Sequence, residues 1–225
     1  MSRESLDNKL QLLADELKVM AGMVELATLG AVEALKNKDF ESARRIYLAD
    51  QEINARRFTL ENDCIITIAT QQPIVARDLR RVASLLDVAS EMERMGDYAK
   101  GIARICLLIG DQPLIKPLID IPRMANKTVD MLHRAVAAFI DTDVEAARQI
   151  PKEDDEIDDL YTQVYRELVV IMLNDRTTID QANHLMWATH NLERMADRVT
   201  NICERTIYVA TSEMHEIEDS DDEIR

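Results

Sequence analysis

Two short stretches of this sequence each carry a pair of carboxylates at a spacing of four residues. Residues 91–98 read EMERMGDY and residues 191–198 read NLERMADR, so both contain Glu-Arg-Met followed by a small residue and Asp. In an α-helix, residues four apart lie on the same face, and like charges so placed repel by about 0.2–0.5 kcal/mol. The sequence therefore repeats an unfavourable pairing, Glu93 with Asp97 and Glu193 with Asp197, that a nearby positive charge would relieve.

The helices that must position these pairs follow from apolar periodicity and from helix-breaking residues. The 5 Gly, 5 Pro and 4% aromatic residues favour an all-α protein. Asp39 is expected to cap the start of one helix, Gly110 to end another, and Pro151 to kink or interrupt a third. Six helices are predicted, over roughly residues 5–35, 39–70, 76–109, 122–140, 143–173 and 178–211.

The chain also contains an internal repeat that extends beyond the two acidic pairs. Residues 31–46 align with residues 135–150, and residues 50–54 (DQEIN) align with residues 154–158 (DDEID), both at an offset of 104. A repeat of this length indicates two copies of one structural unit. We therefore predict two pseudo-symmetric three-helix bundles, residues 1–110 and 111–212, with a Pro-rich linker at 111–121 and an acidic, disordered tail at 213–225.

Short connections make the second and third helices of each half antiparallel neighbours. Counting equal numbers of residues outward from the turn near Pro73 sets Asp50 and Asn54 level with Glu93 and Asp97. The same count from the turn near Arg176 sets Asp154 and Asp158 level with Glu193 and Asp197. Seven carboxylates are thus candidate metal ligands: Asp50, Glu93, Asp97, Asp154, Asp158, Glu193 and Asp197.

Two interpretations of these acids stay open from the residues alone. They form a solvated acidic face with Arg94 and Arg194 as local partners, or they form an oxygen-rich site for a hard cation. His190, three residues before Glu193, is placed where it could approach such a site. Trp187 and the 11 methionines are expected to pack between helices, and the three cysteines to lie in the core.

Charge and cysteine content narrow the class of protein. The formal net charge of −15 argues against nonspecific nucleic-acid binding and against direct docking on an anionic membrane. The three cysteines, an odd number without metal-type spacing, fit a reducing compartment. The sequence shows neither a signal peptide nor an apolar run of about 18 residues. We expect a cytoplasmic protein that meets a membrane only through its partners.

The chain resembles the PhoU family of phosphate-signalling regulators. The resemblance spans about residues 5–211 and is carried by the motifs at 93–97 and 193–202 and by QQPIVARDLR at 71–80. It implies an all-α, homodimeric, non-enzymatic adaptor between the ATPase subunit of the high-affinity phosphate ABC transporter and a sensor histidine kinase. Such an adaptor represses the phosphate-starvation response when phosphate is plentiful. The resemblance also implies iron or zinc clusters on the seven carboxylates, with magnesium or manganese as alternatives.

The sequence departs from the family pattern at several positions, and one alternative function class remains. Tyr98 and Arg198 stand where the family often has His, Asn54 replaces a carboxylate, and Gly101 stands where the second half has Asn201. The alternative is a carboxylate-bridged metalloenzyme or a metal-storage bundle, which usually needs two Glu-x-x-His pairs. The sequence contains none, and its nearest stretch is Asp-Met-Leu-His at residues 130–133.

Overall fold

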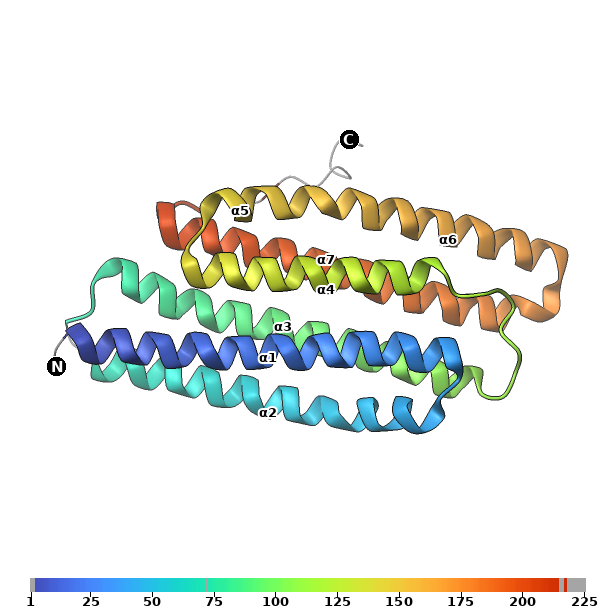
Figure 1. Ribbon diagram of the computed structural model, residues 1–225, viewed down its shortest axis with the longest axis horizontal. Helices are drawn as coiled ribbons and strands as arrows, with labels where there is room; N and C mark the ends of the chain where they lie inside the picture. The colour runs from blue at the N-terminus through green and yellow to red at the C-terminus, as the bar shows by residue number, and fades with distance from the viewer. Residues whose placement is uncertain (1–2, 72, 215–216, 218–225) are drawn as a thin grey trace.

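The computed structural model describes residues 3–71, 73–214 and 217, so most of the predicted acidic tail lies outside the described residues. Within them the chain is helical and contains no strand, which confirms the predicted all-α class. The first bundle consists of α1 (Arg3–Asn37), α2 (Phe40–Thr70) and α3 (Ala76–Ile109). The second bundle lies alongside it and is built from α4 (Asp120–Asp141), an interrupted helix and α7 (Ile179–Thr211) (Figure 1).

The interruption of the fifth predicted helix falls at Pro151, as expected from a residue that lacks the backbone N–H. The segment is divided into α5 (Val144–Gln149), a 3₁₀ turn η1 (Ile150–Glu153) and α6 (Asp154–Asn174), and a second 3₁₀ turn η2 (Arg176–Thr178) precedes α7. This break matters for the site because α6 begins at Asp154, one of the candidate ligands.

Helix ends follow the local chemistry that the sequence indicated. The Asp39 carboxylate accepts the Ser42 backbone N–H at 3.0 Å, which caps α2. Gly110 ends α3 with a φ of 61°, a backbone conformation that glycine adopts without steric cost. α4 begins at Asp120 rather than near Pro122, because proline is tolerated in the first turn, where its missing N–H would have no helical partner.

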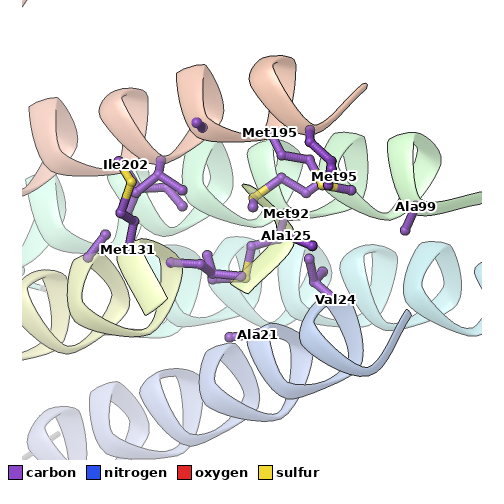
Figure 2. Close-up of a cluster of buried hydrophobic side chains, with 14 of the residues drawn as sticks. Ala21, Val24, Met92, Met95, Ala99, Ala125, Met131, Met195 and Ile202 are labelled. Carbon is purple, nitrogen blue, oxygen red and sulfur yellow. The ribbon is translucent and has the colours of Figure 1, made fainter. Parts of the chain in front are cut away.

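The two bundles share one continuous hydrophobic core. α3 and α7 pack against each other in the middle of the molecule, so that side chains from both halves meet (Figures 1 and 2). Val24 of α1, Met92 of α3, Met131 of α4 and Met195 of α7 are all fully buried in this cluster. No helix in the described part of the chain has an apolar stretch long enough to span a bilayer.

α3 and α7 are antiparallel, and their contacts reveal the symmetry of the repeat. Arg205 Nε lies 3.3 Å from Asp87 Oδ2, and Asn201 Nδ2 lies 3.3 Å from Glu91 Oε2. Residue numbers therefore rise along α3 while they fall along α7. The crossing is centred near the small residues of the two acidic motifs, Gly96 and Ala196, so both motifs lie at the same level of the molecule.

Gly101 permits the close approach of α3 to α7 at the other end of this crossing. A Cβ atom at residue 101 would lie only 2.7 Å from the Asn191 Nδ2 atom, closer than two such atoms can stand. The contact between Gly101 and Asn191 is the pseudo-symmetric counterpart of the contact between Asn201 and Glu91. Residues 101 and 201 differ by 100 in number, and so do residues 91 and 191. A larger residue at 101 would have to displace the Asn191 amide.

Candidate carboxylate sites

The first group of acids lies between α2 and α3, as the counting argument predicted. A Cβ built on Gly96 would stand 3.6 Å from Asp50 Oδ1, which places Asp50 level with the motif on α3. Asp50 is buried, and its Oδ2 atom accepts hydrogen bonds from Lys100 Nζ at 2.7 Å and Asn54 Nδ2 at 3.3 Å. Lys100 Nζ also lies 3.5 Å from Asp97 Oδ1. One ammonium group thus joins two of the candidate ligands.

Glu93 is the third acid of the first group, and its surroundings show how closely these charges interact. Burial raises the pKa of the Glu93 carboxyl, the Arg57 guanidinium opposes that rise, and the charges of Asp97 and Asp50 add to it. Arg57 projects from α2, so the first group contains cations from both helices. The hydrogen bond to Asp50 raises the pKa of Lys100 and keeps its amine charged.

The second group lies between α6 and α7 and has different neighbours. Glu193 Oε2 stands 3.0 Å from His190 Nδ1, and the Glu193 charge raises the pKa of the half-buried Tyr161 phenol on α6, after burial itself. Burial and the nearby Arg194 lower the pKa of His190 against the opposing charge of Asp197, which favours the neutral imidazole. Asp154 is buried at the start of α6, and Asp158 is half-buried one turn later.

Asp197 faces two arginines that also reach across to α3. Arg194 Nε lies 3.6 Å and Arg198 Nη2 3.9 Å from Asp197 Oδ2. Arg194 hydrogen-bonds Tyr98, which raises the pKa of Arg194, and Arg198 Nη1 lies 3.4 Å from Glu91 Oε2. Arg194 is therefore a local partner of the motif acid, whereas the corresponding Arg94 pairs with Glu91 at 3.4 Å.

Both groups offer oxygen atoms to a metal ion, and both also hold protein cations. Carboxylate oxygens are the ligands that hard cations prefer, and both groups supply them. In the first group Lys100 contacts Asp50 and Asp97, and in the second group Arg194 and Arg198 contact Asp197, so a metal ion would compete with a protein cation in either group. In the second group the donors include one more carboxylate, and the Thr200 hydroxyl on the same face of α7 is buried with no hydrogen-bond partner among the described residues. No three described His, Cys, Asp or Glu side chains stand together as a metal site.

An aromatic patch beside the second group was not anticipated from the sequence. The Trp187 ring lies 5.9 Å from the His190 ring, and the Tyr161 ring lies 6.3 Å from His190 and 6.5 Å from Tyr165. Trp187 is 61% exposed, so the expectation that it packs between helices is wrong. The spacing of three residues from Trp187 to His190, and again from His190 to Glu193, could have shown that the imidazole neighbours both the indole and the acid.

Comparison with known proteins connects this architecture to one family. A family model described as the PhoU domain matches residues 17–106 and again residues 121–206. A phosphate-specific transport system accessory protein PhoU homolog from Clostridium acetobutylicum is 32% identical over 219 residues, which cover 97% of this chain and 100% of the relative. The homolog from Deinococcus radiodurans is 35% identical over 209 residues, 93% of this chain and 98% of that protein.

The same relationship holds in three dimensions. The crystal structure of the phosphate transport system regulatory protein PhoU from Streptococcus pneumoniae matches with a TM-score of 0.86 at 29% identity, over 94% of this chain and 100% of that chain. PhoU from Pseudomonas aeruginosa matches with a TM-score of 0.84 over 92% of this chain. With both repeats matched, and with relatives and structures aligned over nearly its whole length, the chain belongs to the PhoU family.

Proposed function

We propose that this protein is a cytoplasmic negative regulator of phosphate uptake and of phosphate-starvation signalling. One observation carries the proposal: both repeats match the PhoU domain, and relatives named as accessory proteins of the phosphate-specific transport system align over almost the entire chain. We infer that it acts without catalysis, as a homodimeric adaptor between the ATPase subunit of the phosphate ABC transporter and a sensor histidine kinase.

Exposed apolar side chains support a role in protein contacts. Leu12, Val19 and Leu26 follow one another at seven-residue intervals on α1 and are 66%, 46% and 74% exposed. This spacing aligns them in one stripe along the helix. An apolar pocket of about 210 Å³ continues the stripe between α1 and α2, with Leu26 and Ile46 in its lining. Contiguous exposed apolar surface is typical of protein interaction sites.

Metal binding by the motif carboxylates is part of the proposal. An iron or zinc ion, or alternatively magnesium or manganese, would supply positive charge that holds acids of two neighbouring helices together. Because each carboxylate group is contributed by two helices, bound metal would stiffen that pair of helices against each other.

The alternative of a carboxylate-bridged metalloenzyme or a metal-storage bundle has no observation in its favour. Its nearest sequence feature, the stretch from Asp130 to His133, is engaged elsewhere. Asp130 Oδ2 lies 2.8 Å from Arg134 Nη2, and His133 Nε2 lies 2.9 Å from Glu25 Oε2. These residues belong to α4 and are not directed at the motif acids.

Deletion of the gene in its own host tests the regulatory role. In phosphate-rich medium, the deletion strain should express alkaline phosphatase at a raised level, and the wild-type chain supplied from a plasmid should restore repression. Purified protein should also bind the transporter ATPase subunit and the cytoplasmic part of the kinase. Phosphatase expression that stays at the wild-type level after deletion would count against the proposal.

A further inference from the structure

We propose that the pocket between α1 and α2 receives an amphipathic, basic helix of a partner protein. This helix inserts an apolar side chain beside Leu26 and places a lysine or arginine beside Glu52. The inference rests on the role in protein contacts given under the proposed function, and it names the surface used and the chemistry of the partner segment. The observations that carry it are the lining of the pocket and the residues at the same positions of the second repeat.

The pocket is apolar and has room for one side chain. Its volume is about 210 Å³, and its apolar lining includes Met23, Leu26, Ile46, Ala49 and Ile53. A cavity of about 150 Å³ lined by aliphatic side chains is large enough to hold a benzene ring. The pocket can therefore take an aliphatic or aromatic anchor, the kind of residue that carries much of the binding energy of an interface.

The exposed stripe on α1 favours a helix as the segment that docks. Leu12, Val19 and Leu26 recur every seven residues, the spacing by which two helices pack along a seam. Gly22 lies one turn from both Val19 and Leu26, and a Cβ at this position would meet no described residue within 4 Å. This open space leaves room for the close approach of a second helix.

The second repeat closes the corresponding position with an ion pair of its own. At the offset of 104, Lys127 corresponds to Met23, and Glu156 corresponds to Glu52. Lys127 Nζ lies 2.5 Å from Glu156 Oε2, which joins α4 to α6. Met23 and Glu52 both line the pocket, so the correspondence holds in space as well as in sequence. Because methionine replaces the lysine, Glu52 lacks the partner that Glu156 has.

A second set of ion pairs shows the same exchange one turn further along. Arg134 Nη2 lies 2.6 Å from Glu153 Oε2 and 2.8 Å from Asp130 Oδ2. At the offset of 104, the first repeat has an uncharged residue at each of these three positions: Gly30, Ala49 and Leu26. Two repeats of one fold thus differ in whether charged side chains bridge this face. The fold itself does not require an open apolar pocket, which favours a binding role for it.

These exchanges define the chemistry of the partner segment. Its apolar side chain would fill the pocket, and its lysine or arginine would supply beside Glu52 the charge that Lys127 supplies beside Glu156. The formal net charge of −15 attracts a basic segment. A second copy of this chain would bring the same negative charge to the contact, so charge complementarity favours a different protein.

A designed peptide tests the pocket with a defined probe. The probe is a fluorescein-labelled helix of about three heptads, with leucine on one face and lysine on the other, beside a scrambled peptide of the same composition. Fluorescence anisotropy would measure its affinity for wild type and for Met23→Lys/Ala49→Glu, which introduces two side chains of the second repeat without changing the net charge. The matched control Gln51→Lys/Ala55→Glu introduces the same residues at exposed positions of α2 that face away from the pocket. Circular dichroism would establish that each variant is folded.

We expect the variant at the pocket to weaken binding of the patterned peptide at least tenfold, and the control to change it less than twofold. Glu52→Gln, at an exposed position, should weaken binding by about two- to fivefold, the effect of an exposed ion pair. Equal affinity of wild type and the variants, or equal affinity of the patterned and scrambled peptides, would overturn the inference. So would sedimentation that shows a wild-type dimer and a monomeric Met23→Lys/Ala49→Glu, because a second copy would then cover this face. The phosphatase measurement on the deletion strain decides the regulatory role separately from each of these results.

Discussion

Lys100→Met isolates the contribution of the ammonium group that joins Asp50 and Asp97. Methionine keeps most of the unbranched side chain and removes the amine, which also lies 5.6 Å from the centre of the Tyr47 ring. The change leaves the Asp50 carboxylate, which is 3% exposed, with Asn54 as a weaker hydrogen-bond donor at 3.3 Å. Its effect therefore reports the cost of a buried charge that has lost its partner.

The expected loss of stability follows from the exposure of the two groups. Removing one member of a fully buried ion pair costs about 3–5 kcal/mol. Lys100 is 32% exposed, so water partly solvates the amine, and Asn54 retains one hydrogen bond to Asp50. We expect a loss of about 2–3 kcal/mol, a substantial part of a total stability of about 5–15 kcal/mol. The double variant Asp50→Asn/Lys100→Met should recover most of it, because no buried charge remains.

Urea unfolding at pH 7, followed by circular dichroism, measures this difference. At a denaturant slope of about 2–3 kcal/mol per molar, the midpoint of Lys100→Met should fall by about 1 M with the slope unchanged. Lys18→Met is the control, since Lys18 and Asp15 form a pair in which both side chains are 54% exposed, worth at most about 0.5 kcal/mol. If Lys100→Met were no more costly than Lys18→Met, Asp50 would not depend on Lys100, and the reasoning would be refuted.

Three further outcomes are expected. Gly101→Ala should destabilise the chain by about 1–2 kcal/mol in urea unfolding, because the new methyl group meets the Asn191 amide. In an Asn191→Ala background the same change should stabilise the chain by up to about 1 kcal/mol, since alanine favours helix. A loss of stability in both backgrounds would disprove the steric account. Hydrogen bonds from Arg134 lower the pKa of Glu153 below its ordinary value of 4.5. Their stabilisation, about 0.5–1 kcal/mol for a part-exposed pair, is therefore present above that ordinary pKa and is lost as the pH falls through the folded pKa. The urea midpoints of wild type and Arg134→Met should accordingly converge at acid pH, and a constant difference would contradict this assignment. Burial raises the pKa of the Cys203 thiol to about 12, so maleimide labelling should be slow in the native protein and should rise only across the unfolding transition.

The helices and the level of the first group of acids could be predicted from the sequence because both depend on local or regular properties. Helix ends at Asp39, Gly110 and Pro151 reflect capping and backbone chemistry within a few residues. The level of Asp50 relative to Gly96 needs only a constant rise per residue in two antiparallel helices. Neither inference requires knowledge of side-chain direction.

The counterions could not be predicted in the same way, because they depend on which helix faces which. Arg94 lies next to Glu93 in sequence, yet it pairs with Glu91, while the cation that reaches Asp50 and Asp97 comes from Lys100. The antiparallel crossing of α3 and α7, which draws Arg198 toward Glu91, joins residues more than 100 apart. The exposure of Trp187 likewise depends on where neighbouring helices stop covering α7.

The comparison of the two repeats shows why the motif alone does not define a binding site. Glu-Arg-Met-small-Asp is the same in both repeats, so any property carried by the motif must be shared by both. Residues that differ in charge lie outside it, and they include Lys100 against Thr200, Arg57 against Tyr161 and Tyr98 against Arg198. Clustered acids repel one another in either repeat, and the cation beside the motif Asp differs: Lys100 contacts Asp97, whereas Arg194 and Arg198 contact Asp197. The neighbours of each motif, and not the motif itself, therefore set the local balance of charge.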